Sequence, residues 1–328
     1  MSASGGAGTG SRTTGRSLAA LLGSLAFASA WFIVLKEGTS ISYLQLTFLV
    51  LLVGAFATGT IFVLFGLPTL PKGAASPFRQ GGFWVLVGVW GLVSYFGETL
   101  ELTWASHSLG ADPAAVIFRT WPLFYILFVY VFLKQPTSRT HLLCVLAGVA
   151  LFAATTYLGN ATGTGLAFAA VPAAVVLIAA VSDAAATTAT RRFAYAPAVA
   201  LFPINLVALA AIFPIAEAGG VANAAGLTGS DWIIVLWLAI ITGTFQTFLF
   251  MVAARSFAPS TLGLAYLTVP VWTGALGWIF LREVPSLGTL VLGLGITALL
   301  ALVYLFPDDP ARSRSPGAPA SAGLPPAP

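Results

Sequence analysis

The chain has 328 residues, of which 58% are hydrophobic and only 7% are charged. That balance excludes an ordinary soluble domain, in which about a quarter of the residues are charged. The formal net charge of +4 could suggest a nucleic-acid partner, so the positions of the charges must decide. The single cysteine, Cys144, excludes an intramolecular disulfide and has no partners for a metal site. The sequence predicts neither a metal nor a cofactor.

Apolar runs long enough to cross about 30 Å of hydrocarbon recur along the chain. Because backbone hydrogen bonds must then close within each segment, we predict an all-α integral membrane fold. Ten transmembrane helices are expected, at about 17–35, 43–66, 83–107, 113–133, 141–158, 164–187, 198–217, 231–254, 260–281 and 286–306. Residues 1–16 and 307–328 are rich in small residues and proline, and we expect both to be disordered tails.

One stretch of the chain occurs twice. Residues 98–142 align without a gap to residues 246–290 when Pro122 is placed over Pro270. The matches include Thr99 with Thr247, Ala105 with Ala253, Ser108 with Ser256 and Phe132-Leu133 with Phe280-Leu281. We therefore predict two five-helix repeats, 17–160 and 161–306. Five is odd, so the second copy enters the membrane inverted, which is the usual plan of a secondary transporter with its solute site between the copies.

The basic residues agree with this topology. If the chain starts in the cytoplasm and each helix crosses once, all but three of the 14 Lys and Arg residues lie inside. Lys36 and Arg282 fall outside, and Arg119 falls within a helix. This positive-inside bias predicts a multi-pass protein of the cytoplasmic (inner) membrane with both termini cytoplasmic. It also explains the net charge without a nucleic-acid partner.

Four charged residues lie within predicted helices, where each costs at least about 2.5–3.5 kcal/mol on insertion scales. They are Glu98 and Glu101 on the third helix, Arg119 on the fourth and Asp183 on the sixth. Counted from the outer end, Glu101 lies about 9 Å deep, Arg119 about 10 Å and Glu98 about 14 Å. Glu101 and Arg119 can therefore meet at one level.

These charges allow two interpretations. In one, Glu101 and Arg119 form a structural ion pair and Glu98 is neutral. In the other, Arg119 receives a substrate carboxylate, while Glu98 or Glu101 holds an ammonium group or takes up a proton. The second copy has Gln246 opposite Glu98 and Leu267 opposite Arg119, so the scaffold itself requires none of these charges.

Prolines and aromatic residues extend the candidate site. Pro122 and Pro270 mark the middle of the fourth and ninth predicted helices, where proline removes a hydrogen bond and kinks the helix. We expect both to be hinge residues. Asp183, near the cytoplasmic end of its helix, is a candidate gate residue, although local pairing also explains it. Tyr95, Trp121 and Tyr266 lie close by in sequence, and if they line a cavity they favour an aromatic or apolar substrate moiety.

Each half of the chain closes with the same pattern, an apolar helix with a central proline, then Leu-[Lys/Arg]-[Gln/Glu], a short turn and a last helix. The matching residues are Leu133-Lys134-Gln135 and Leu281-Arg282-Glu283. Over 17–306 this resembles the EamA family of the drug/metabolite transporter superfamily, which implies ten helices in two inverted repeats. Gln135 and Arg119 depart from the family pattern. Val93-Ser94-Tyr95 and Trp121-Pro122 are similar to the aromatic amino-acid exporter branch.

The sequence thus predicts a secondary transporter that exports a small metabolite by alternating access, favouring aromatic or other zwitterionic amino acids. The alternatives are a permease for a nucleoside, polyamine or drug-like compound, a channel-like facilitator, and a membrane scaffold without flux. The predicted substrate-binding residues are Arg119, Glu98, Glu101, Tyr95, Trp121, Tyr266 and Gln246. No base is spaced to activate a serine or threonine, and no nucleotide-binding loop is present, so no enzyme is expected. The partners are the solute and membrane lipid, while proton coupling and oligomeric state stay open.

Overall fold

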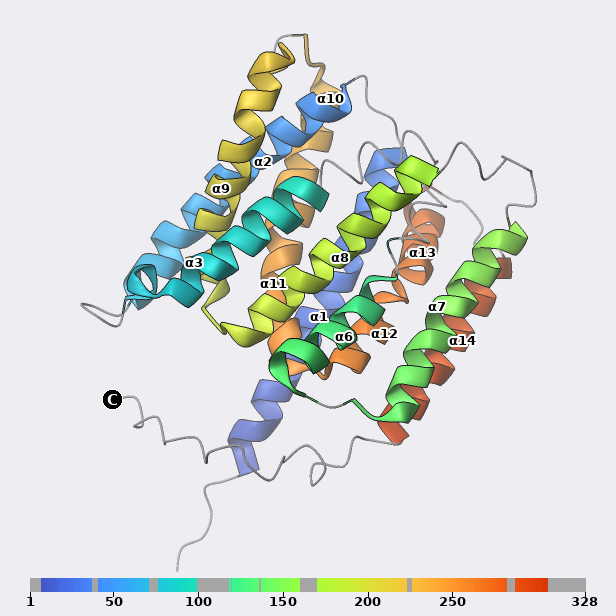
Figure 1. Ribbon diagram of the computed structural model, residues 1–328. Helices are drawn as coiled ribbons and strands as arrows, with labels where there is room; N and C mark the ends of the chain where they lie inside the picture. The colour runs from blue at the N-terminus through green and yellow to red at the C-terminus, as the bar shows by residue number, and fades with distance from the viewer. Residues whose placement is uncertain are drawn as a thin grey trace, which may run out of the picture.

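The computed structural model describes residues 7–36, 41–70, 76–98, 118, 120–135, 137–159, 170–222, 226–281 and 287–305. Within these ranges the chain is all-helical, and its helices lie side by side in one bundle (Figure 1). Consecutive elements join into ten helical segments, and each segment overlaps one of the ten predicted ranges. The predicted all-α fold and the number of helices are therefore confirmed for the described residues.

The segments are as follows in chain order. The first half contains α1 (Ala7–Lys36), α2 (Tyr43–Ile61) continued by η1 (Phe62–Gly66) and η2 (Leu67–Thr69), α3 (Gly81–Gly88) continued by η5 (Val89–Glu98), α6 (Trp121–Leu133) and α7 (Arg139–Gly159), with the single turn η4 (Pro77–Arg79) before α3. The second half contains α8 (Ala170–Arg192), α9 (Pro197–Ala218), α10 (Gly229–Leu236) continued by η6 (Trp237–Gln246) and α11 (Thr247–Ser256), α12 (Pro259–Tyr266) followed by α13 (Val269–Leu281), and α14 (Leu287–Leu305).

Local sequence explains where several helices begin. The Ser42 side chain accepts a hydrogen bond from the Gln45 amide at the start of α2. At α10, Thr228 and Asp231 form a capping box, in which each side chain satisfies the other residue's backbone N–H. Proline occupies the first turn of α9 and of α12, where its missing N–H costs nothing.

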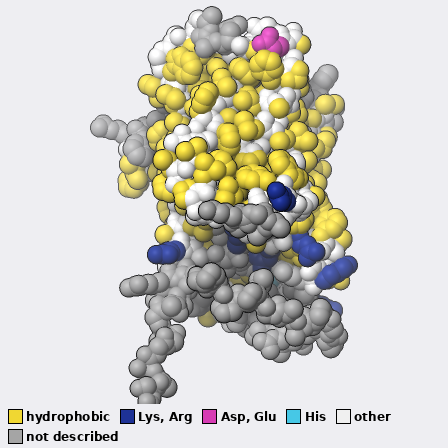
Figure 2. All heavy atoms as spheres, turned by 90° about the vertical axis from the view of Figure 1, so that its left-hand side faces the viewer, with side chains coloured by type: hydrophobic (Ala, Val, Ile, Leu, Met, Phe, Trp, Pro, Cys, Tyr) yellow, Lys and Arg dark blue, Asp and Glu magenta, His cyan; other side chains and the backbone are white. Residues whose placement is uncertain are grey.

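The outer surface of the bundle is apolar. Large hydrophobic side chains are widely exposed, for example Phe56 at 72% and Leu294 at 76%. Figure 2 shows such side chains covering the middle of the visible face. Four described stretches are long and apolar enough to cross a membrane, namely Tyr43–Thr69, Ala174–Arg192, Pro197–Ala218 and Gly229–Ser256. Soluble monomers rarely expose so much apolar surface, so these helices indicate a multi-pass membrane protein.

Charged side chains gather at the two ends of the bundle. In Figure 2 the lysines and arginines lie toward the lower end and an acidic side chain lies at the top. The lower end, which we call the basic end, holds the connections and helix ends that carry Arg16, Arg79, Lys134, Arg139, Arg191, Arg192 and Arg255. The acidic residues Glu217 and Asp231 belong to the end of α9 and the start of α10, at the opposite end.

The two halves of the chain are intertwined. The first helix of each half packs mainly on the other half, since α1 contacts η6, α11 and α13, whereas α8 contacts η5 and α6. The remaining large contacts also cross between halves, with α2 against α9 and α7 against α14. Neither half therefore has a hydrophobic core of its own.

Pro122 and Pro270 each stand in the first turn of a helix. Pro122 stands in the first turn of α6, directly after a turn at Thr120. In the ninth segment α12 ends at Tyr266, and α13 begins at Val269 with Pro270 in its first turn. Proline lacks an N–H and clashes with the carbonyl of the preceding turn, so it starts a helix more readily than it continues one. In the ninth segment the described residues show two helices separated by a short turn, whereas most residues before Thr120 lie outside the described ranges.

Close backbone approach at glycines makes this packing testable. A Cβ added to Gly91 would lie 2.8 Å from the Ile204 carbonyl oxygen in α9, whereas one added to Gly88 would meet nothing within 4 Å. We expect Gly91→Ala to destabilise the protein by about 1–3 kcal/mol through overpacking. The unfolding temperature of detergent-purified protein should fall accordingly. Gly88→Ala, in the same helical segment, is the control and should not lower it; equal unfolding temperatures would contradict the close contact.

Candidate functional site

A cluster of aromatic rings is buried where η5, α6, α11 and α12 meet. We call it the aromatic cluster, and its members are Trp90, Tyr95, Trp121, Tyr125, Phe250 and Tyr266. The ring centroids of Phe250 and Tyr266 lie 5.1 Å apart, and those of Trp121 and Tyr266 lie 5.7 Å apart, both edge to face. Such pairs add about 0.5–1.5 kcal/mol each beyond the burial of their surface. The aromatic cluster is therefore a tightly packed group of rings to which both halves of the chain contribute.

A network of hydrogen bonds joins Ser24, Gln246 and Tyr266 at the edge of the aromatic cluster. The Ser24 hydroxyl donates to the Gln246 carbonyl oxygen at 3.3 Å and is hydrogen-bonded to the Tyr266 hydroxyl. Gln246 Nε2 donates to the Tyr266 hydroxyl at 3.3 Å and to Ser24 Oγ at 3.5 Å, while Thr247 donates to Gln246 Oε1 at 3.3 Å. Because an unpaired polar group is costly away from water, these bonds hold α1 against η6 and α12.

Two donors in the aromatic cluster, the Trp121 indole N–H and the Tyr125 hydroxyl, have no hydrogen-bond partner among the described residues. Trp121 is only 1% exposed, and among the described residues its Nε1–H makes no hydrogen bond. Buried tryptophans usually find an acceptor for this group. By contrast, Trp90 Nε1 donates to the Thr190 hydroxyl at 2.7 Å. The indole N–H of Trp121 can therefore donate to an acceptor on a bound solute.

The structure brings together four of the residues predicted for the site, namely Tyr95, Trp121, Gln246 and Tyr266. The Tyr95 hydroxyl donates to the Gly243 carbonyl in η6, which places it between the same two halves. The side-chain positions of the other predicted residues, which are the charged ones, are not described. Glu98 is the last residue of η5, but its side chain, Glu101 and Arg119 lie outside the described residues.

The three predicted hinge and gate residues have different positions. Pro122 packs directly on α12, since a Cβ on Gly263 would lie 2.6 Å from the Pro122 Cβ. Pro270 stands in the first turn of α13, and its side chain lies outside the described residues. Asp183 is partly buried within α8, about two turns before Arg191. Of the three, only Pro122 is shown beside the candidate site. It contacts α12 at Gly263, within one turn of Tyr266.

Sequence reasoning missed Ser24, Trp90 and Phe250. Ser24 carried a weak signal, because a serine within an apolar run must find a partner inside the protein. The two aromatic residues carried none, because tryptophan and phenylalanine are common throughout such helices.

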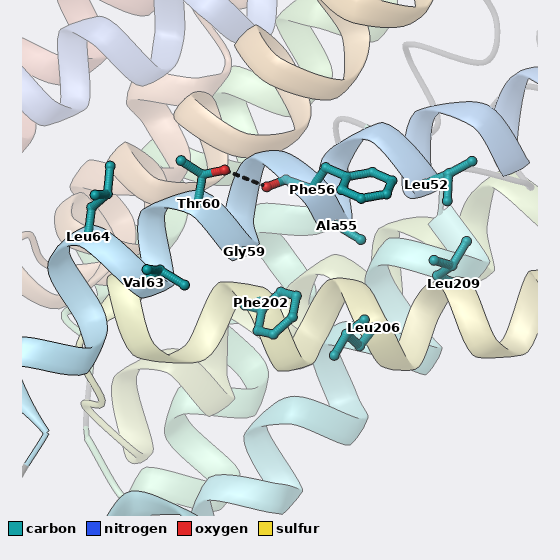
Figure 3. Close-up of a pocket in the computed structure, with 10 residues that line it drawn as sticks. All are labelled: Leu52, Ala55, Phe56, Gly59, Thr60, Val63, Leu64, Phe202, Leu206 and Leu209. Atoms are coloured by element: carbon teal, nitrogen blue, oxygen red, sulfur yellow. Dashed lines mark hydrogen bonds between the residues drawn. The ribbon is translucent and has the colours of Figure 1, made fainter.

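A separate pocket lies on the outside of the bundle between α2 and α9 (Figure 3). It has a volume of about 570 Å³ and is lined by Leu52, Ala55, Phe56, Gly59, Thr60, Val63, Leu64, Phe202, Leu206 and Leu209. The one polar side chain in this lining, Thr60, donates to the Phe56 carbonyl of its own helix at 3.0 Å. No free polar group is left there to orient a solute, so the interior cluster remains the candidate site.

The comparisons with known proteins bear on the fold. No family model matches the sequence, and no curated protein sequence matches it either. Among solved structures, one crystal structure superposes with a TM-score of 0.70 at 19% sequence identity. The match covers 90% of this chain and 98% of the other. At that identity the likeness shows a shared fold and leaves the function open.

Removing one hydroxyl from the network should cost stability. Tyr266→Phe leaves Ser24 and Gln246 with fewer partners, which costs about 1–3 kcal/mol for buried groups. We expect a lower unfolding temperature for the purified protein in detergent. Tyr130→Phe deletes the same atom from a side chain of α6 that is 60% exposed, and it should change the unfolding temperature little. Equal effects of the two substitutions would contradict the network.

Proposed function

We propose that the protein is a secondary transporter that moves a small organic solute across the cytoplasmic membrane by alternating access, as in the EamA family of the drug/metabolite transporter superfamily. The observation that carries this proposal is the buried site of aromatic rings and paired polar groups contributed by both halves of a membrane-type bundle. Solute sites of such transporters lie near the middle of the membrane, where two repeats meet.

The bounds of the helices support an inverted repeat. α3 and α10 have 8 residues each, η5 and η6 have 10 each, and α6 and α13 have 13 each. Each later element starts at the position that the alignment of Pro122 with Pro270 assigns to it. The contacts are paired in the same way, with α1 against η6 and α13, and α8 against η5 and α6. A molecule with approximate two-fold symmetry has this pairing.

The charge distribution supports the orientation of the chain. Basic residues near the ends of transmembrane helices favour the cytoplasmic side, and the basic end carries seven described arginines and lysines, namely Arg16, Arg79, Lys134, Arg139, Arg191, Arg192 and Arg255. We therefore assign the basic end to the cytoplasm. With ten crossings, both chain termini then lie on that side.

The short helices next to the candidate site could tilt independently during transport. The break between α12 and α13 lies next to Tyr266, and the start of α6 at Trp121 packs on α12 through Pro122 and Gly263. Discontinuous helices at the solute site are common in transporters, because two short helices can tilt separately where one long helix would resist. The π-helical turns of η5 and η6 end at Glu98 and Gln246, and such turns are frequent at functional sites.

The chemistry of the site favours a zwitterionic solute with an aromatic or apolar part. The aromatic cluster supplies surface for the apolar part, and Trp121 Nε1 and the Gln246 amide supply polar contacts. In this proposal Arg119 receives the carboxylate, and Glu98 or Glu101 holds the ammonium group or takes up a proton. Aromatic amino acids fit this description best.

Counterflow in liposomes tests the proposal. Purified protein is reconstituted into vesicles loaded with unlabelled phenylalanine, and uptake of labelled phenylalanine is followed, with nucleosides and polyamines as parallel arms. We expect saturable uptake that requires solute inside. Uptake that rises linearly with concentration indicates a channel, and absence of flux for every solute contradicts a transporter.

Substitution of Arg119 tests the carboxylate anchor. Arg119→Ala and Arg119→Gln should both abolish amino-acid transport while the amount of folded membrane protein is retained, because neither side chain offers a charged fork of donors. Wild-type transport by Arg119→Gln defeats this role. Equal loss of folded protein in Arg119→Ala and Glu101→Ala, restored by the charge-swapped double variant, favours the structural ion pair instead.

The unpartnered indole of Trp121 gives a second test. Trp121→Phe removes a donor that stabilises nothing in the empty protein, so it should raise the KM for transport about two- to tenfold, the value of one hydrogen bond. Its unfolding temperature without solute should change less than that of Trp90→Phe. The Trp90 control loses an existing bond to Thr190. An unchanged KM in Trp121→Phe removes this residue from the proposed site.

A further inference from the structure

Two arginines connect α8 and α11 across the basic end of the bundle. Arg191, in the last turn of α8, donates through Nη1 to the Phe257 carbonyl oxygen at 2.7 Å and to that of Ala254 at 3.4 Å. Arg255, in the last turn of α11, donates through Nη2 to the carbonyl of Tyr195, in the connection that follows α8. Each helix thus contributes an arginine that binds the backbone at the end of the other.

A third element joins this contact. Arg191 Nε donates to Gln135 Oε1 at 3.0 Å, just after the end of α6. Tyr195 continues the chain of bonds toward α3, because its hydroxyl donates to Gln80 Oε1 at 2.7 Å. Helices from both halves of the chain are therefore fastened to one another at the basic end, and Figure 1 shows the lower ends of α6, α8 and α11 converging there.

Closely packed side chains lie in the helices next to these arginines. Val129 of α6, Ala186 of α8, and Met251 and Ala254 of α11 are all fully buried. They belong to the same core as the aromatic cluster. Among the described residues, the hydrogen bonds of the two arginines therefore lie beside a tightly packed core.

The acceptors of these arginines are neutral. Among the described residues, the hydrogen bonds of Arg191 and Arg255 go to carbonyl and amide oxygens, with no carboxylate. The Nε–H of Arg255 is buried and has no partner there at all. A guanidinium bonded to a carboxylate gains about twice as much as one bonded to a neutral acceptor, and its fork matches the two carboxylate oxygens. A carboxylate that enters from this end can therefore displace the carbonyls.

Arg191 also leads inward to the candidate site. Gln135, which accepts from Arg191 Nε, follows α6, the helix that carries Tyr125 and Trp121. The rings of these two residues lie 5.8 Å apart, centroid to centroid, so α6 connects the basic end to the aromatic cluster.

We propose that Arg191 and Arg255 form the cytoplasmic gate of the transporter and that the carboxylate of an incoming solute opens it by taking over their hydrogen bonds. This inference rests on the proposed function, which assigns the basic end to the cytoplasm. The arginines bind the backbone while no solute is present, and they turn to the carboxylate when one arrives. The gate thus selects solutes by their charge. The interior site then selects among them by shape.

Thiol labelling from the cytoplasmic side tests the gate without measuring transport. Cys144, the single cysteine, is replaced by alanine, and Val129→Cys places a thiol behind the arginines. Inside-out membrane vesicles are treated with a membrane-impermeant maleimide. We expect slow labelling in this parent and labelling at least about tenfold faster in Arg191→Gln or Arg255→Gln, since a bond to a charged group contributes about 1.5–3 kcal/mol.

Arg192→Gln is the matched control. Arg192 is adjacent to Arg191 and exposed, so its replacement should leave the labelling rate unchanged. If Arg191→Gln and Arg255→Gln label as slowly as the parent while counterflow proceeds normally, the gate proposal fails and the proposed function stands. If counterflow is absent but both variants label faster, the arginines limit access at this end, but the transport proposal fails and the carboxylate-opened gate fails with it.

A second experiment adds a ligand to the protein with both arginines intact. It therefore tests the gate proposal even if the glutamine variants do not fold. Phenylalanine should accelerate labelling of the Val129→Cys thiol, whereas phenylalaninamide, which lacks the carboxylate, should not. Acceleration by both compounds, or by neither, overturns the carboxylate trigger. Inorganic phosphate is a further arm, and acceleration by phosphate alone assigns the arginines to a different anion and also overturns the proposal.

Discussion

The membrane interior offers no water, so every polar group placed there must find its partner within the protein, and most of this structure follows from that constraint. The backbone satisfies it by forming helices throughout the described residues. Ser24, Gln246 and Tyr266 satisfy it by bonding to one another across the two halves of the chain. Arg191 and Arg255 satisfy it with backbone carbonyls at helix ends. A few buried polar atoms have no partner among the described residues, and the Trp121 N–H is one that a bound solute would complete.

Because the two halves are intertwined, the contacts between them are coupled across the whole bundle. Because α1 packs on the second half and α8 on the first, a shift of one half changes contacts at both ends of the bundle. Gly91 allows η5 to approach α9 closely, and Gly263 allows α12 to approach α6 closely. Small residues at such points let helices slide with little loss of contact. The proposed alternating access would use this property of the packing.

The sequence was sufficient for the helices and for part of the site. Apolar length predicted the helical segments, and alignment of Pro122 with Pro270 singled out Gln246, which the structure joins to Tyr266. The sequence could not supply Ser24 as a partner, because the pairing depends on α1 crossing to the second half. It could not distinguish a kink from a break at Pro270, which is decided by the turn at Leu267 and Thr268. Arg191 and Arg255 were recognised as topology signals, but their mutual bracing required the helix ends to be placed in space.

The bond between Ser24 and Tyr266 joins residues that are 242 positions apart in the chain, and this distance has a consequence for biosynthesis. At about 5–20 residues per second, ribosomes need roughly 12–50 seconds to make the intervening chain. During that time α1 is already in the bilayer with its serine facing lipid or a temporary neighbour. Although α1 is made before the other described helices, it is thus among the last of them to reach its final place. The nascent chain needs a holding partner in the membrane, which insertion factors or the helices of its own first half would provide.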